Sequence, residues 1–468
     1  VYAVFNNHKK GNFNPCVMVS NDKWSSWQSI VSSLPLRGSV YDLVEDHEDE
    51  NLLFVGTEFG VYFTYNGGKE WKQLKNGIPT IAVRDLEIQK RENDLVLATF
   101  GRSFYVLDDY SSLRYLKDKI NTKAYIFPIK KSLMYIDSRP LGLRGKGSQG
   151  ASLYTAKNPP IGAVFNYILN DSLKTRKEIR QETEKKQFKA GEEITYPSIE
   201  QFKVEDNEEN PYLIFTILDE KSNELRKINK KPTTGLNTLV WNFRLTPQKN
   251  ISLKSSMPGR YSEASNGPLA LPGNYFVTMH KVENGKSTLL VDKTPFECEW
   301  LNQLSTPTDD KVARLSFQLK VDQLRKAVDA SSEVLEEDQK RLEFIESAFK
   351  SYPNLDLSYL MKLNKLKYNL KEIKIMLYGD QSLSSRDIEQ KEAISSKVGI
   401  IIWNMWRNRS NPTVTNKKLY ESASNNFEKL IIDMQSLDNF IKEIEKYLES
   451  KQVPFTPGRG LILNWKKE

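Results

Sequence analysis

Cysteine and histidine are scarce in this chain, and their scarcity limits the chemistry available to it. Only two cysteines (Cys16 and Cys298) and three histidines (His8, His47 and His280) occur in 468 residues. The histidines lie far apart, and none belongs to a zinc-ligand spacing such as HExxH. Two cysteines provide neither a zinc site nor a disulfide framework, so we expect two buried free thiols. The sequence therefore predicts no metal site and no cofactor.

Long apolar runs and charge of one sign are also missing. The longest apolar run, VGIIIW over Val398–Trp403, is far shorter than the roughly 20 residues that a membrane helix needs. The formal charge of +8 comes from 68 basic and 60 acidic residues that are interleaved, as in RKEIRQETEKKQ. A nucleic-acid surface would gather one sign on one face, so we expect no nucleic-acid partner. Gly142–Ser152 is glycine-rich but lacks the Lys-Ser/Thr ending of a phosphate loop, which predicts an ordinary loop.

What the chain does contain is a hairpin motif, TYNGGKEW. Thr64 begins a turn, and Asn66 can accept hydrogen bonds from nearby backbone N–H groups. Gly68 and the glycine before it tolerate the positive φ angles of a tight turn. Trp71 is expected to fold back over the turn and to bury a large ring. Each position thus has a structural task in closing a hairpin.

An altered copy of this motif begins 44 residues earlier, at Ser20 instead of Thr64. Asp22 matches the asparagine and Trp27 matches the closing tryptophan. Trp24 stands where the second glycine should be, so we expect that turn to be built differently. A period of about 40–50 residues with several short strands per unit is typical of β-propeller blades.

The shared pattern, Ser/Thr-x-Asp/Asn-x-Gly-x-x-Trp, resembles the Asp-box, or bacterial neuraminidase repeat. The run LLFVGTEFGVYFTYNGGKEW and the later RENDLVLATFGRSFYVLDD are similar to the end of sortilin-like propellers in large bacterial proteins of the glycosyl hydrolase-like type. The tail VPFTPGRG (Val453–Gly460) is similar to the terminus of that family. The resemblance implies that residues 1–122 are the last propeller blades. Because two to three blades cannot close a ring, we expect Val1 not to be the native N-terminus and further blades to lie upstream.

Residues 123–306 alternate apolar and polar side chains in runs such as GAVFNYIL, YLIFTILDE and TLVWNFRL. Asn284-Gly285 is the favoured pair for a type I′ hairpin turn. This rhythm predicts an immunoglobulin-like sandwich, similar to those that follow the main domain in many secreted bacterial enzymes. The charged stretch Asp171–Glu193 is expected to be an exposed excursion between strands.

Residues 307–468 have helical periodicity, which predicts an antiparallel helical bundle. Asp309 or Asp310 can cap the first helix, and Pro353 with Asn354 ends it. Three further helices are expected at Leu357–Tyr378, Ser385–Arg407 and Asn416–Ser450. The sequence as a whole predicts a multidomain chain of partial propeller blades, a β-sandwich and this bundle.

Two classes of function remain open at this point. The first is a non-catalytic, exported protein of the periplasm, outer-membrane surface or medium that binds a protein, peptide or glycan, with an outer-membrane transport or secretion complex as its setting. The second is a sialidase-like or endoglucanase-like glycoside hydrolase whose catalytic residues lie mostly upstream. No catalytic residue is assigned. Four charged residues that follow or lie on blade strands are pocket candidates: Glu58, Arg84, Arg102 and Asp108. Inter-blade ion pairs are the structural alternative for them.

Overall fold

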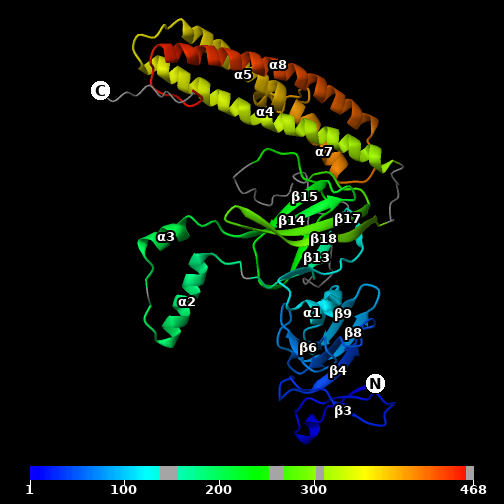
Figure 1. The fold of residues 1–468 in the computed structure, drawn as a ribbon. Coiled ribbons are helices and arrows are strands. Elements are labelled where there is room, and N and C mark those ends of the chain that lie inside the picture. The colour runs from blue at the N-terminus through cyan, green and yellow to red at the C-terminus, as the bar shows by residue number, and fades with distance from the viewer. Residues whose placement is uncertain (137–155, 172, 195, 252–266, 302–309, 460–468) are drawn as a thin grey trace. The chain divides into compact units, whose positions relative to one another are not determined.

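The computed structural model describes residues 1–136, 156–171, 173–194, 196–251, 267–301 and 310–459 (Figure 1). They belong to two compact units. The first contains Val1–Leu133, Ser148–Asn242 and Asn274–Cys298, and the second contains Met134–Gly147, Phe243–Gly273 and Glu299–Glu468. The chain is mainly β-sheet followed by a helical region, as the sequence predicted. The loop expected at Gly142–Ser152 lies outside the described residues.

Three antiparallel sheets follow one another at the start of the first unit. The first sheet consists of β1 (Tyr2–Val4), β2 (Val17–Val19) and β3 (Gln28–Ser29). The second consists of β4 (Val40–Glu45), β5 (Leu53–Thr57), β6 (Gly60–Thr64) and β7 (Lys72–Leu74). The third consists of β8 (Val83–Gln89), β9 (Asp94–Thr99) and β10 (Phe104–Leu107). Sequence neighbours pair within each sheet, so each one is a simple meander.

The second sheet is buried on both faces because it lies between the other two. Along β5, Leu53 and Val55 join one apolar cluster together with Val17 of β2. Phe54 points the other way and joins a second cluster together with Leu97 of β9. Alternate side chains of a strand point to opposite faces, which is why one strand serves two cores. Every residue of β5 is therefore buried.

A two-sheet sandwich forms the rest of the first unit. One sheet is ordered β11 (Ala124–Ile126), β13 (Ala163–Leu169), β16 (Gly235–Trp241). The other is ordered β12 (Ser132–Met134), β18 (Lys286–Trp300), β17 (Gly273–Glu283), β14 (Tyr212–Asp219), β15 (Glu224–Lys230). Aromatic rings join the two sheets: Tyr167 lies 5.0 Å from Phe215 and Phe165 lies 5.1 Å from Phe296. The predicted hairpin turn is confirmed, with φ of 49° and 74° at the Asn-Gly pair between β17 and β18.

Short helices interrupt the strands of this unit. They are η1 (His8–Lys10), η2 (Tyr110–Tyr115), α1 (Leu116–Lys119), α2 (Arg176–Ala190) and α3 (Ile199–Asp206). The predicted exposed excursion between β13 and β14 is confirmed, and α2 forms most of it with no buried residue. Thr175 and Glu178 make a reciprocal capping box that starts this helix.

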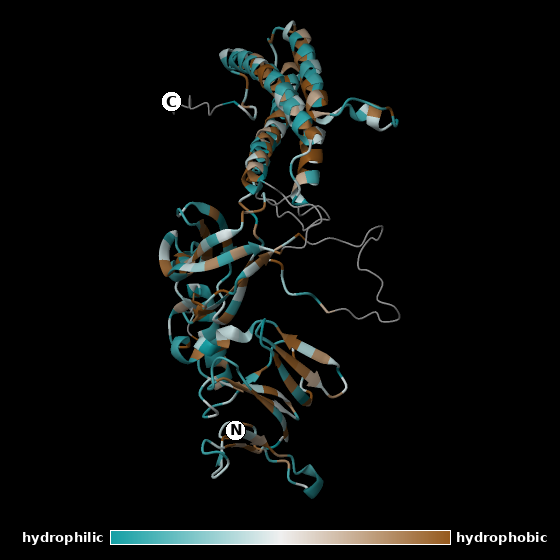
Figure 2. Ribbon diagram, turned by 90° about the vertical axis from the view of Figure 1, so that its right-hand side faces the viewer, coloured by the Kyte–Doolittle hydropathy of each residue, from teal (hydrophilic) through white to brown (hydrophobic). Residues whose placement is uncertain are grey.

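The second unit holds the helices α4 (Lys311–Ser351), α5 (Tyr359–Tyr378), α6 (Gln381–Ser384), α7 (Ile394–Trp406) and α8 (Val414–Ser450). Asp310 caps α4 by accepting a 2.8 Å hydrogen bond from the N–H of Ala313, as predicted. The third helix was expected from Ser385 but begins at Ile394, after the short α6. Brown and teal stripes along these helices mark their apolar and polar faces (Figure 2).

The direction of the helices differs from a simple antiparallel bundle. Contacts of α4 with α8 pair Phe317 with Tyr420 and Phe349 with Tyr447, so these two helices run parallel. The reason is that α5 and α7 run in the same direction as each other. Both run antiparallel to the 41-residue α4, one after the other along its length. Ion pairs such as Lys367 with Glu346 show that α4 and α5 are antiparallel. The prediction of antiparallel packing therefore holds for α4 with α5 but not for α4 with α8.

Buried arginines surround the C-terminal end of α7. Arg244 donates to the carbonyl oxygen of Trp406 at 2.9 Å, and Arg314 donates to that of Asn408 at 3.2 Å. Arg409 donates to the carbonyl oxygens of Met134 and Leu301. Burial, followed by repulsion from the two neighbouring guanidinium groups, lowers the pKa of Arg314 to about 10. Cations at a helix C-terminus meet the negative end of its dipole, so carbonyl oxygens stabilise this group of charges.

Candidate functional site

The turn after β6 is closed by side-chain hydrogen bonds. The hydroxyl of Thr64 donates to Oδ1 of Asn66 at 2.8 Å, and the N–H of Gly68 donates to that hydroxyl at 3.1 Å. The N–H of Glu70 then donates to Oδ1 of Asn66 at 3.0 Å. The side chains at the first and third motif positions thus hold the backbone of the whole turn.

The turn after β2 has the same three hydrogen bonds. Ser20 donates to Asp22 at 2.9 Å, the N–H of Trp24 donates to the Ser20 hydroxyl at 2.8 Å, and the N–H of Ser26 donates to Asp22 at 2.8 Å. The expectation that Trp24 would require a different turn is wrong. Trp24 adopts a φ of 74°, close to the 86° of Gly68.

Solvent explains why a tryptophan fits the glycine position. Trp24 is 67% exposed, so its side chain extends into solvent. At Gly68 a Cβ would lie 2.8 Å from Cβ of Ile30, which leaves no room for a side chain. Hydrogen bonds from Ser26 lower the pKa of Asp22 to about 2, so this carboxylate is charged when it closes the turn.

The two closing tryptophans differ in their surroundings. Trp71 is 5% exposed, and its indole N–H donates to the carbonyl oxygen of Ile30 at 2.6 Å. The backbone N–H of Trp71 donates to Ser33 at 2.5 Å. Trp71 therefore packs on the segment that follows β3, and it joins the second sheet to the first. Trp27 is 42% exposed.

The turns after β2 and β6 lie at one end of the three sheets. The opposite end carries a set of loops that are joined by hydrogen bonds. The N–H of Gly38 donates to the carbonyl oxygen of Phe13, that of Glu58 to Ser39, and that of Phe100 to Ala82, all within 3.0 Å. These bonds connect the β1–β2 loop, the β5–β6 turn and the β9–β10 turn with the starts of β4 and β8. We call this surface the loop face, and it consists of residues 5–16, 36–41, 58–59, 84 and 100–103.

Two β-bulges lie where β4 and β8 meet the loop face. On β4 the pairing with β5 shifts at Tyr41, between Val40 and Asp42. On β8 the pairing with β9 shifts at Arg84, between Val83 and Asp85. A bulge leaves one residue unpaired and redirects its side chain, and such bulges are frequent beside functional sites. Equivalent positions of two sheets thus present Tyr41 and Arg84.

Arg84 is stacked at this point. Its guanidinium carbon lies 3.9 Å from the ring centre of Tyr41 and 5.3 Å from that of Phe100. Arg37, three residues before β4, has its guanidinium carbon 5.2 Å from the ring centre of Phe13. Stacking on aromatic rings orients a guanidinium group and leaves its N–H edge available for a carboxylate.

Two carboxylates lie directly behind the bulges. Asp42 accepts a 2.7 Å hydrogen bond from the N–H of Leu86, which ties the second sheet to the third. The pKa of Asp42 is raised, first by burial and further by the nearby carboxylate of Asp85. The hydrogen bond from Leu86 gives Asp42 a structural role between the second and third sheets.

Three of the four pocket candidates lie at the same end of the sheets. Glu58 in the β5–β6 turn, Arg84 on β8 and Arg102 in the β9–β10 turn all belong to the loop face. Asp108 follows β10 and lies at the other end of the third sheet, where burial and then Asp94 raise its pKa. Four residues of β10 separate it from the loop face, about 13 Å of extended chain. Asp108 is thus too far from Glu58 to complete a carboxylate pair with it.

Sequence reasoning missed Tyr41, Phe100, Asp42 and Asp85. A signal for them exists: VYDL at residues 40–43 recurs as VRDL at residues 83–86. The repeated valine, aspartate and leucine mark equivalent strand positions, and the differing second residue is the bulged one.

Comparisons with known proteins assign no family to this chain. No family model matches it. No curated protein matches it either. Among solved structures, it is similar to BT4673 from B. thetaiotaomicron, described in one structure as the extracellular domain of a one-component system and in another as that of a hybrid two-component system.

Those similarities are distant. The first has 13% identity and a TM-score of 0.18, and it covers 62% of this chain and 29% of the other. The second has 10% identity and a TM-score of 0.16, and it covers 64% of this chain and 30% of the other. This chain thus spans less than a third of each of these two solved chains.

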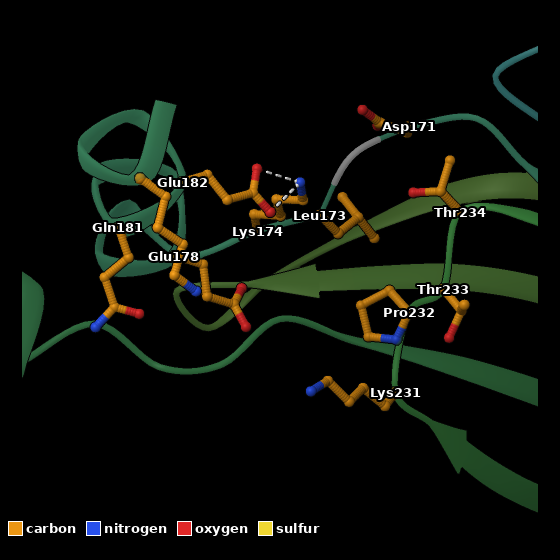
Figure 3. A pocket seen from close by; sticks show the side chains of 11 residues that line it. Asp171, Leu173, Lys174, Glu178, Gln181, Glu182, Lys231, Pro232, Thr233 and Thr234 are labelled. Carbon is orange, nitrogen blue, oxygen red and sulfur yellow. Dashed lines mark hydrogen bonds and ion pairs between the residues drawn. The ribbon is translucent and has the colours of Figure 1, made fainter. Parts of the chain in front are cut away.

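A pocket of about 380 Å³ lies beside α2 in the first unit (Figure 3). The connection of residues 231–234 forms its other wall. Lys174 donates to both carboxylate oxygens of Glu182 at 2.6 Å inside it. Because its lysines and carboxylates are mixed, the pocket favours neither sign of ligand.

The described residues also bear on metals, thiols and membranes. Within them, no group of three or more histidine, cysteine, aspartate or glutamate side chains is placed to hold a metal ion. Cys16 and Cys298 are both free, although Cys16 is only half-buried rather than buried. None of the helices in the described ranges has both the length and the hydropathy needed to cross a bilayer.

Proposed function

We propose that this chain is part of an exported, non-catalytic bacterial protein whose loop face binds a protein partner. The observation that carries this proposal is the repeated bulge, at which the exposed Arg84 lies on the ring of the half-buried Tyr41. Phe100 extends the stack and is 69% exposed. Arginine and aromatic side chains dominate the energetics of protein interfaces, and here they are held in place before any partner arrives.

The architecture that we propose around this face is an Asp-box propeller followed by an immunoglobulin-like sandwich. The two turns with identical hydrogen bonds and the two equivalent bulges support it, since both features recur with the period of a blade. We place the protein in the periplasm, at the outer-membrane surface or in the medium. As its setting we propose an outer-membrane transport or secretion complex, with the helical bundle as the docking element.

The loop face suits binding better than hydrolysis. A glycosidase needs a general acid and a second carboxylate at a defined separation. Of the carboxylates considered, Asp42 accepts a hydrogen bond that joins two sheets, and Glu58 and Asp108 lie at opposite ends of their sheets. The hydrolase alternative therefore gains no support from these residues.

Native co-purification tests the proposal. The tagged full-length protein would be isolated from its own host, and stoichiometric partners would be identified by mass spectrometry. One variant changes the loop face through Phe100→Ser and Arg102→Ser. The matched control changes one exposed aromatic and one exposed cation of α2 through Phe188→Ser and Lys189→Ser.

We expect a stoichiometric partner with the wild-type protein and the control, and its loss with the loop-face variant. Circular dichroism of both variants would verify that the fold is intact. A partner that both variants retain would refute binding by the loop face. Turnover of a polysaccharide or sialoside by the purified protein would refute the non-catalytic assignment.

A further inference from the structure

Charge is divided between the two ends of the three N-terminal sheets. The loop face carries five cationic side chains and one acidic one, Lys9, Lys10, Arg37, Arg84 and Arg102 with Glu58, and the exposed carboxylate of Asp85 borders it next to Arg84. The other end, where β4, β8 and β10 finish, carries mainly carboxylates: Asp22, Asp46, Glu48, Asp49, Glu50, Glu92, Asp94, Asp108 and Asp109. That end also carries the cations Lys23, Lys69, Lys90, Arg91, Arg114 and Lys130. Three of them form ion pairs there: Arg114 with Asp46, and Arg91 and Lys130 with Glu92.

Apolar side chains are interspersed with the cations of the loop face. Leu36 is 91% exposed and precedes Arg37, and Phe100 stands two residues before Arg102. Phe59 is also exposed and lies next to Glu58. Phe5 is exposed on this face as well. A purely electrostatic surface would not expose four large apolar side chains, whereas a surface that buries apolar groups in a complex would.

Resting on the proposed function, we infer that the partner presents an acidic peptide segment with aromatic or aliphatic side chains among its carboxylates. The N–H edge of the stacked Arg84 suits a carboxylate, and Arg102 offers a second cation beyond the Phe100 ring. The apolar side chains of the segment would cover Leu36, Phe59 and Phe100. Complementary charge would orient the segment on this end and keep it from the acidic opposite end.

A binding measurement with defined probes tests this inference. Fluorescent poly(Glu,Tyr) copolymer is the principal probe, with poly-Glu, poly-Lys and polygalacturonate compared at the same charge concentration. The full-length protein is titrated at low and at moderate salt. The test variant is Arg84→Ser with Arg102→Ser, and the control variant is Lys90→Ser with Arg91→Ser at the acidic end.

We expect saturable binding of poly(Glu,Tyr) that weakens with salt and exceeds the binding of poly-Glu. The loop-face variant should bind at least about tenfold more weakly, and the control variant should match the wild type. Absence of binding, equal binding by both variants, or preference for poly-Lys or polygalacturonate would overturn the inference. If co-purification still finds a partner that depends on the loop face, only the acidic chemistry fails and the proposed function stands.

Discussion

Asp46 connects the second and third sheets through a dense set of hydrogen bonds. Its carboxylate accepts from the Tyr110 hydroxyl at 2.6 Å and from Arg114 at 2.7 and 2.8 Å. The N–H groups of Glu48 and Asp49 complete the set. The residue is only 2% exposed, so water cannot replace these partners. The turn after β4 is thereby fixed to η2.

These contacts determine how the stability of this region depends on pH. Burial by itself would raise the pKa of Asp46, but the hydrogen bonds from Arg114 and Tyr110 outweigh it and lower the pKa to about 2, from an ordinary value of 3.8. A depressed pKa means that the stabilisation is present above pH 3.8 and is lost as the pH falls toward 2. At about 1.4 kcal/mol per pKa unit, the contribution is about 2 kcal/mol.

Asp46→Asn tests this reasoning. The NH₂ group of the asparagine would face the hydrogen-bond donors of Tyr110, Arg114 or the backbone, where two donors cannot pair. We therefore expect the free energy of unfolding to fall by about 2–4 kcal/mol at pH 6. The variant should also lack the wild-type decline between pH 4 and 2. Urea unfolding at each pH, followed by pulsed hydrogen exchange of peptides from residues 40–116, reports on this region specifically.

Parallel decline of both proteins below pH 4 would refute the assignment, because another carboxylate would then be responsible. Asp94→Asn is a matched control, since its carboxylate accepts one backbone N–H from Asp109 and makes none of the contacts of Asp46. That variant should retain the wild-type decline. An unchanged stability of Asp46→Asn at pH 6 would contradict the hydrogen-bond geometry itself.

Three further predictions concern other parts of the chain. Trp24→Gly should raise the local unfolding free energy by about 1 kcal/mol, because glycine adopts the positive φ without strain. A urea titration of the protein that monitors residues 17–30 would detect this gain, and a loss of stability would refute the strain argument. Arg341→Met should lower the free energy of unfolding by about 3–5 kcal/mol, because Glu445 and Asp338 would stay buried without their cation. Thermal unfolding of the helical region measures this loss, and an unchanged melting temperature would refute the prediction. Cys298, whose pKa is raised to about 12 by burial, should resist alkylation at pH 8 while Cys16 reacts, and equal labelling in quantitative mass spectrometry would contradict that.

The sequence predicted most of what is repetitive or periodic in this structure. The meander sheets, the Asn284-Gly285 hairpin and the Asp310 cap follow from local rules about turns, alternation and capping. The start of α7 was missed by nine residues, since polar Ser385–Lys391 has no strong signal separating helix from loop. The parallel course of α4 and α8 could not be predicted, because it depends on α5 and α7 sharing one return.

Trp24 shows a different limit of sequence reasoning. Replacement of glycine by tryptophan seemed incompatible with the turn, yet the hydrogen bonds of Ser20 and Asp22 hold the same backbone. A strained φ costs only about 1–2 kcal/mol, and three hydrogen bonds that satisfy the turn outweigh it. What forbids a side chain at Gly68 is Ile30, which directly follows β3, and that contact cannot be read from the local sequence.

The loop face shows where repetition and function separate. In VYDL and VRDL the repeated residues have structural tasks: Val40 and Val83 are buried, and Asp42 joins two sheets. The position that differs, tyrosine in one and arginine in the other, is the bulged position. In a repeat that packs against its neighbours, packing and pairing restrict the residue type at the regular strand positions. At the bulge the backbone leaves the hydrogen-bond ladder of the sheet, and that restriction is relaxed. The departures are therefore where this chain can acquire a partner without disturbing its core, and Arg84 between Tyr41 and Phe100 is such a place.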